Sequence, residues 1–134
     1  RRVRPRHVAA LRQRGLDLVV PMVGPGRHVG FTLFKGRVAV ACIGFRHVWG
    51  AVCSGWVLTS ALVSECPKLL HKLTLRGLEW MERRRGVKRV EARVLCSFDA
   101  AQKWAERLGF VWEGFEPWAG PNCENFFRYG RLAL

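Results

Sequence analysis

The sequence predicts an α/β (α+β) fold, in which a mixed central sheet is covered by helices on both faces. Two observations support this prediction. Apolar runs typical of strands alternate with segments of helical periodicity, and hydrophobic residues make up 49% of the 134 residues, which is enough for a core. The length suits one domain over residues 1–134, and the chain shows no internal repeat and no low-complexity segment.

The N-terminal part of the chain is basic and rich in turn-forming residues. Residues 1–15 are predicted to form a basic arm, with a short helix from Arg6 to Arg14 that ends at Gly15. Proline and glycine recur in Pro21–Gly30, which predicts a loop. The order expected at this end of the chain is therefore a helix followed by a loop.

Two strands are predicted in the next segment, at Arg37–Phe45 and Gly50–Ser60. Both runs are continuously apolar and rich in small and β-branched residues, which is typical of strands buried on both faces. The residues between them, RHVWG, predict a hairpin loop. These two strands are therefore expected to lie in the centre of the sheet.

A long helix is predicted from Pro67 to Arg85. Proline suits the first helical position, leucines recur at helical spacing, and Gly86 suits the left-handed residue that ends a helix. The basic run Arg83–Arg85 lies in the predicted last turn, where the helix dipole favours positive charge. The next segment, Val87–Leu95, alternates apolar and charged residues and is predicted to be a strand.

The segment FDAAQKWAERLGFVWEG, from Phe98 to Gly114, has the clearest pattern in the chain. Its predicted helix has Ser97 as N-cap and Gly109 as its left-handed stop. One apolar stripe at i, i+3, i+4 and i+7 is formed by Ala101, Trp104, Ala105 and Leu108. Two final strands, Phe110–Pro117 and Asn125–Ala133, are predicted to complete the sheet.

The chain is strongly basic, with 23 Lys and Arg residues against 10 Asp and Glu and a formal net charge of +13. This charge favours acidic partners such as nucleic acid, although a solvated basic surface accounts for it equally well. No apolar run approaches the ~20 residues that span a bilayer. The opening RRVRPRH is not followed by the apolar run of a signal peptide, so a cytoplasmic location is expected.

Five cysteines are present and none forms a C-x-x-C pair. Their spacing predicts neither a zinc site nor a disulfide framework, and we expect no metal. Cys42, Cys53 and Cys96 lie in apolar runs and are expected to be buried thiols. A reducing compartment fits this pattern.

The run of strand, helix, LGF and two strands resembles the end of proteins of the GNAT superfamily of N-acetyltransferases. The pattern A-x-x-W-A-x-x-L-G-F-x-x-E-G, from Ala101 to Gly114, carries the resemblance at residue level, and the order of elements extends it over Arg37–Leu132. The chain also resembles small GNAT-like proteins of tailed phages, including internal virion proteins, which often have Trp in the helix before LGF. The resemblance implies one GNAT-like domain that lacks the family's first strand.

The resemblance implies an acetyl-CoA site at the end of the predicted strand Gly50–Ser60. The GNAT enzymes bind the pyrophosphate at a glycine-rich turn, where free N–H groups and a helix N-terminus attract anions. The matching segment of this chain, Thr59–Leu70, contains no glycine. The implied cofactor-binding residues are Leu58, Thr59, Ser60, Lys68, Lys72, Ser97 and Trp104.

Three residues are candidates for proton transfer. Glu65 is the carboxylate nearest to the predicted cofactor strand, and His47 could act as a base near neutral pH. The GNAT enzymes often place a tyrosine acid in the helix before LGF, where this chain has Trp104, whose indole N–H is not an acid. Tyr129, the one tyrosine of the chain, is the remaining candidate. Helix capping by Glu65, exposure of His47 and core packing of Trp104 are the structural alternatives.

Three functions are consistent with the sequence. The first is an N-acyltransferase that transfers an acetyl group from acetyl-CoA to an amine acceptor, with weak or absent activity because the glycine-rich turn and the tyrosine are missing. The second is a non-catalytic GNAT-fold virion or assembly protein, located in the host cytoplasm or the virion, with other virion proteins as partners. The third is a basic nucleic-acid-binding module.

Overall fold

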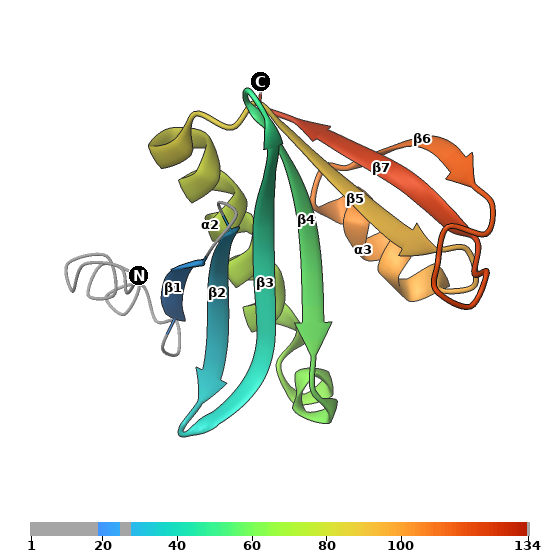
Figure 1. Ribbon diagram of the computed structural model, residues 1–134. Coiled ribbons are helices and arrows are strands. Elements are labelled where there is room, and N and C mark those ends of the chain that lie inside the picture. The colour runs from blue at the N-terminus through green and yellow to red at the C-terminus, as the bar shows by residue number, and fades with distance from the viewer. Residues whose placement is uncertain (1–18, 25–27, 134) are drawn as a thin grey trace.

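The computed structural model describes residues 19–24 and 28–133, which form one seven-stranded mixed sheet and two α-helices (Figure 1). The strands lie in the order β1-β2-β3-β4-β5-β7-β6. β4 and β5 are parallel, and every other neighbouring pair is antiparallel. The elements are β1 (Val19–Gly24), β2 (His28–Lys35), β3 (Val38–Trp49), β4 (Val52–Thr59), the 3-10 helix η1 (Ala61–Glu65), α2 (Pro67–Arg85), β5 (Arg89–Leu95), α3 (Asp99–Arg107), β6 (Val111–Glu116) and β7 (Phe126–Leu132).

Both helices lie on the same face of the sheet (Figure 1). α2 packs against β2 and β3, α3 packs against β5, and the two helices contact each other through His71 and Trp104. The predicted class, a mixed sheet with helices packed on it, is confirmed. The sequence predicts helices on both faces, but α2 and α3 share one face. The predicted helix Arg6–Arg14 and the basic arm lie outside the described residues.

Two loops predicted from the sequence are strands in the structure. The loop predicted at Pro21–Gly30 is wrong, because most of this segment belongs to strands: β1 extends to Gly24 and β2 begins at His28. Pro21 is tolerated because β1 is the edge strand of the sheet, where one side of the backbone needs no ladder partner. The hairpin loop predicted at RHVWG is also wrong, since β3 continues to Trp49 and the turn lies at Gly50, with a φ of 50°.

The predicted helix ends are mostly confirmed. α2 begins at Pro67 and ends before Gly86, whose φ of 65° is left-handed, and Gly109 after α3 has a φ of 91°. Ser97 is wrong as the cap of α3, because the N-cap position is Phe98 and no side chain caps the helix. Gln102 holds this turn instead, by donating from Nε2 to the carbonyls of Leu95 and Cys96.

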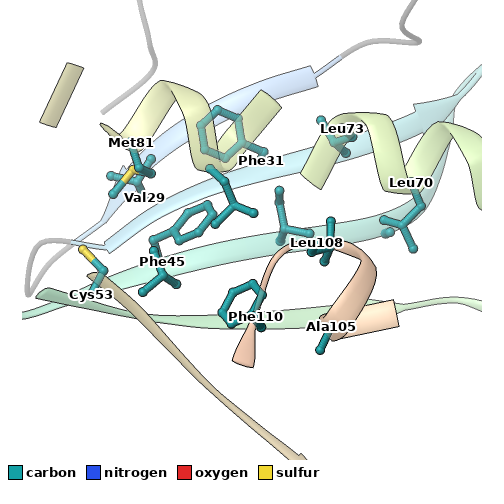
Figure 2. Packing of buried hydrophobic residues seen from close by; sticks show 14 of the residues in the cluster. Val29, Phe31, Phe45, Cys53, Leu70, Leu73, Met81, Ala105, Leu108 and Phe110 are labelled. Carbon is teal, nitrogen blue, oxygen red and sulfur yellow. The ribbon is translucent and has the colours of Figure 1, made fainter. Parts of the chain in front are cut away.

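The core lies on the helix-covered face of the sheet, and much of it is formed between α2 and the strands β2 and β3 (Figure 2). It continues to α3 through Ala105 and Leu108. Phe31, Ile43 and Phe45 point at the helix, where Gly77 allows a close approach: an added Cβ would lie 2.8 Å from Ile43 Cδ1. Burial of each such side chain contributes about 1.5–3 kcal/mol. The core therefore ties α2 to the first half of the sheet.

The opposite face of β5, β6 and β7 carries matched charges. Arg89 of β5 donates from both terminal nitrogens of its guanidinium group to the two carboxylate oxygens of Glu113 of β6. Arg93 Nε donates to Glu116 Oε2 at 2.7 Å, and Arg128 of β7 lies 3.7 Å from Glu116. The hydrogen bond from Arg89 lowers the pKa of Glu113 below its ordinary value. Since these charges satisfy one another, the C-terminal half of the sheet can present this face to water.

We predict that Leu73→Ala destabilises the protein by about 2–5 kcal/mol, because Leu73 is 1% exposed at the centre of the α2 interface and its truncation leaves a cavity. Urea denaturation at fixed temperature measures the change. The matched control is Leu58→Ala, which removes the same atoms from a side chain that is 67% exposed and should change stability by no more than about 0.5 kcal/mol. Equal losses in the two variants would contradict this packing.

Candidate functional site

A wedge opens in the sheet between β4 and β5. The two strands pair only where Val52–Ser54 meets Arg89–Glu91, and beyond that point they diverge (Figure 1). β4 continues to Thr59 paired with β3, and β5 continues to Leu95 paired with β7. No strand of the described chain pairs with the two edges that face the wedge. Alternate backbone N–H and C=O groups on these edges therefore point into it.

A cavity of about 500 Å³ fills the wedge and extends between α2 and α3. Its wall is mostly apolar, and Arg93 is the one charged residue among those that line it. Part of the cavity exists because the α3 side chains that border it are small: Ala100, Ala101 and Ala105 all line it. Other lining residues come from β4, β5 and α2: Gly55, Trp56, Val57, Thr59, Leu70, Thr74, Leu78, Val90, Ala92 and Val94. A concave apolar site of this size can take a small-molecule ligand.

A hydrogen bond joins the two helices beside the cavity. Trp104 Nε1 of α3 donates to His71 Nδ1 of α2 at 3.1 Å, and both side chains are half-buried. Because Nδ1 accepts this bond, the neutral imidazole carries its proton on Nε2. Trp104 also lines the cavity, so the bond fixes the position of an indole that a ligand would touch.

The three predicted catalytic residues lie apart from one another, and none of them lines the cavity. Glu65 is exposed at the end of η1, and its Oε2 lies 3.7 Å from Lys35 Nζ. His47 lies at the β3–β4 turn, where Nε2 is 2.9 Å from the carbonyl of Gly50. Tyr129 is buried in β7 between β5 and β6. The structure does not bring these side chains together.

The predicted cofactor-binding residues divide into two groups. Thr59 and Trp104 line the cavity. Leu58 lies between Val57 and Thr59 on β4, and because side chains alternate along a strand, it points to the other face and is exposed. The remaining residues are exposed and do not line the cavity: Ser60, Ser97, Lys68 and Lys72.

The segment between β4 and α2 is compact. Residues Ala61–Glu65 form η1, and the amide of Leu70 already donates to the carbonyl of Cys66. Val63 of η1 and Leu70 of α2 line the cavity, so apolar side chains border it at the segment that the resemblance matches to the glycine-rich turn. This end of the cavity is thus poorly suited to a pyrophosphate group, since side chains restrict close approach to the backbone.

All five cysteines are free thiols. Cys53 is buried as predicted, and burial raises the pKa of its thiol, whereas Cys42 and Cys96 are only half-buried. Within residues 19–24 and 28–133, no cluster of three or more His, Cys, Asp or Glu side chains could hold a metal ion. In the same part of the chain, neither helix is long and apolar enough to cross a membrane.

Sequence reasoning missed most of the cavity wall. Ala105 and Leu108 of the predicted α3 stripe are buried in the core as predicted, but Ala101 and Ala105 also border the cavity. His71 is not singled out by any motif. A signal was available on α2, where Leu70, Thr74 and Leu78 recur at i, i+4 and i+8 and so share one face. Arg93 gives no such signal, because it lies on the charged side of the alternating segment Val87–Leu95.

This arrangement, a mixed sheet whose two central parallel strands diverge beside two helices, is the fold of the GNAT acetyltransferases. The ribosomal-protein-S5-alanine acetyltransferase from Vibrio fischeri is similar over 94% of this chain and 67% of its own, with a TM-score of 0.70 and 12% identity. A mutant form of spermidine N-acetyltransferase from Vibrio cholerae is similar over 82% of this chain and 68% of its own, with a TM-score of 0.70 and 13% identity.

An acetyltransferase of the GNAT family from Bacillus anthracis is similar over 78% of this chain and 65% of its own, with a TM-score of 0.65 and 14% identity. This chain therefore spans about two thirds of the length of these proteins. At such identities the likeness concerns the fold. No family model matches the sequence, and the search of curated proteins found no match.

We predict that Tyr129 of the native protein ionises above the ordinary tyrosine pKa of about 10. Burial raises the pKa of its phenol, and the nearby Glu106 and Cys96 raise it further. Because it is the chain's one tyrosine, the ultraviolet absorbance of tyrosinate reports it alone. In the unfolded chain the phenol ionises at the ordinary pKa. The free energy of unfolding should therefore fall as pH rises beyond that pKa, and Tyr129→Phe should remove this pH dependence. A native titration at the ordinary pKa would contradict the burial.

We predict that the bond from Trp104 to His71 stabilises the protein by about 0.5–1.5 kcal/mol. A double-mutant cycle with Trp104→Phe, His71→Leu and the double variant, followed by urea denaturation, measures the coupling directly. The Phe variant keeps most of the ring and removes the N–H, and the double variant controls for changes in packing. A coupling energy near zero would show that the two helices do not interact through this pair.

Proposed function

We propose that the chain binds acetyl-CoA, or a related acyl thioester, in the wedge between β4 and β5 and transfers the acyl group to an amine acceptor. The observation that carries the proposal is the wedge itself: two strand edges with free backbone groups beside an apolar cavity of about 500 Å³. When bound, acetyl-CoA supplies the activated acetyl thioester that an amine attacks. The GNAT fold and its acetyltransferase neighbours support this kind of reaction.

The wedge fits the thin arm of coenzyme A better than it fits the nucleotide end. The arm carries amide groups that can pair with free N–H and C=O groups along the edges of Gly55–Thr59 and Ala92–Val94. The alanines of α3 leave room for it beside Trp104. The pyrophosphate fits less well, because η1 and Val63 occupy the corresponding end. We therefore expect weak binding.

In the wedge, backbone groups are the donors that could polarise the carbonyl of the thioester. N–H groups on the free edge of β4 are positioned to donate to the oxygen on which negative charge develops during acyl transfer. Among the described residues that line the cavity, none carries a carboxylate or an imidazole, and the guanidinium of Arg93 is held by Glu116. The proposed roles of Glu65, His47 and Tyr129 in proton transfer stay predictions. An amine that has already lost its proton in solution is the acceptor this wall favours.

The experiment is a calorimetric titration of acetyl-CoA into the protein at moderate salt. We expect saturable binding that is lost in Ala101→Trp, because the indole would fill the cavity from α3. The matched control, Ala119→Trp, adds the same side chain at an exposed loop position away from the wedge and should bind as the unmodified chain does. No heat up to millimolar acetyl-CoA, or equal loss in both variants, would overturn the proposal.

A non-catalytic GNAT-fold protein is the second candidate. It is favoured by the separation of the three predicted catalytic residues and by the lack of glycine between Thr59 and Leu70. Such a protein would keep the wedge as a binding site, and a role in a phage particle or its assembly stays a prediction. Acetyl-CoA binding without release of free thiol in the presence of varied amines would favour this candidate over the enzyme.

A further inference from the structure

We propose that the outer face of α2 is a binding surface for the phosphate backbone of double-stranded nucleic acid. This face carries four cations at helical spacing, which we call the α2 stripe: Lys68, Lys72, Arg76 and Arg83. The helical rise of 1.5 Å per residue spreads them over about 22 Å along one side of the helix. The inference is independent of acyl transfer.

The α2 stripe faces away from the cavity. Leu70, Thr74 and Leu78 line the cavity from the opposite side of the helix. At 100° per residue, Lys72 and Thr74 lie about 200° apart around the helix axis. The cations of the α2 stripe therefore do not line the cavity, and binding of a ligand there does not explain their presence.

The stripe cations lack acidic partners among the described residues, whereas three arginines of β5 and β7 are paired with glutamates. Arg89, Arg93 and Arg128 each bind a glutamate of β6. Over residues 67–88 the chain has seven basic and two acidic residues, and one of those acids, Glu82, is bound by Arg131. Glu79, the other acid, lies within the stripe without forming an ion pair. Within the described part of the chain, the unpaired positive charge is thus concentrated on α2.

The residue types on the α2 stripe favour a nucleic-acid duplex over a lipid surface or a single strand. The apolar residues of α2 belong to the core or pack partly against it, so the outer face has no apolar wedge to insert into a lipid layer. No aromatic residue occupies a stripe position, so the stripe offers no platform for stacking unpaired bases. A row of point charges without base-reading groups suits the regular phosphates of a duplex, with little dependence on sequence.

The test is fluorescence anisotropy of a labelled duplex with the full chain over a series of salt concentrations. We expect the triple variant Lys72→Gln, Arg76→Gln, Arg83→Gln to lower the slope of log K against log salt by about 2.7, since each phosphate contact contributes about 0.9. Glu79→Gln should tighten binding, because it removes the acid within the stripe. A single-stranded oligonucleotide of the same length should bind more weakly than the duplex. Circular dichroism checks that each variant is folded.

The matched control is the triple variant Arg37→Gln, Lys103→Gln, Arg107→Gln, which removes the same charge from exposed residues on other elements. Its slope should change by less than one. Equal changes in the two triple variants would show that diffuse net charge, and not the α2 stripe, binds the duplex. Absence of duplex binding, or preferential binding to vesicles containing phosphatidylserine, would also overturn the proposal.

Discussion

The pairing of β4 with β5 over three residues is the constraint on which the rest of the structure depends. These are the central parallel strands, and each is held on its outer side by a long antiparallel partner. The two halves of the sheet are therefore rigid by themselves and joined at one end. Strand twist then carries the halves apart beyond Ser54, and the gap cannot be closed by backbone hydrogen bonds. The cavity, its two free edges and the contact between α2 and α3 all follow from this divergence.

The helix α2 has a different role on each of its sides. One side packs on Phe31, Ile43 and Phe45, where Gly77 permits close approach, and this contact fixes the helix to the first half of the sheet. A neighbouring side lines the cavity and meets Trp104 of α3 through His71. The outer side carries cations that have no acidic partner among the residues the structure describes. Because one rigid helix joins these features, a ligand in the wedge and a polyanion on the outer face would contact the same element without competing for the same side chains.

The chemistry of the wedge follows from what the divergence exposes. Backbone amides and small apolar side chains line it, whereas the titratable side chains predicted for catalysis are held elsewhere: Glu65 near Lys35, His47 at the Gly50 turn, and Tyr129 in the interior of the second half. A site of this kind can bind and orient a thin ligand by its backbone. It gives the protein little means of moving protons, which is why weak turnover and a purely binding role remain the two functions to separate by experiment.

The sequence by itself determined the strands and α-helices from β3 onward, apart from the end of β3. The local signals are continuous apolar runs for β3 and β4, Pro67 and Gly86 at the ends of α2, and the apolar stripe and Gly109 of α3. The sequence did not predict β1 and β2, because their proline and glycine residues locally indicate a loop, whereas an edge strand tolerates proline. Only the tertiary structure decided the site. Which side chains meet in the wedge depends on where β4 and β5 part and on how α2 and α3 turn toward each other, and these are contacts between distant segments that no local pattern records.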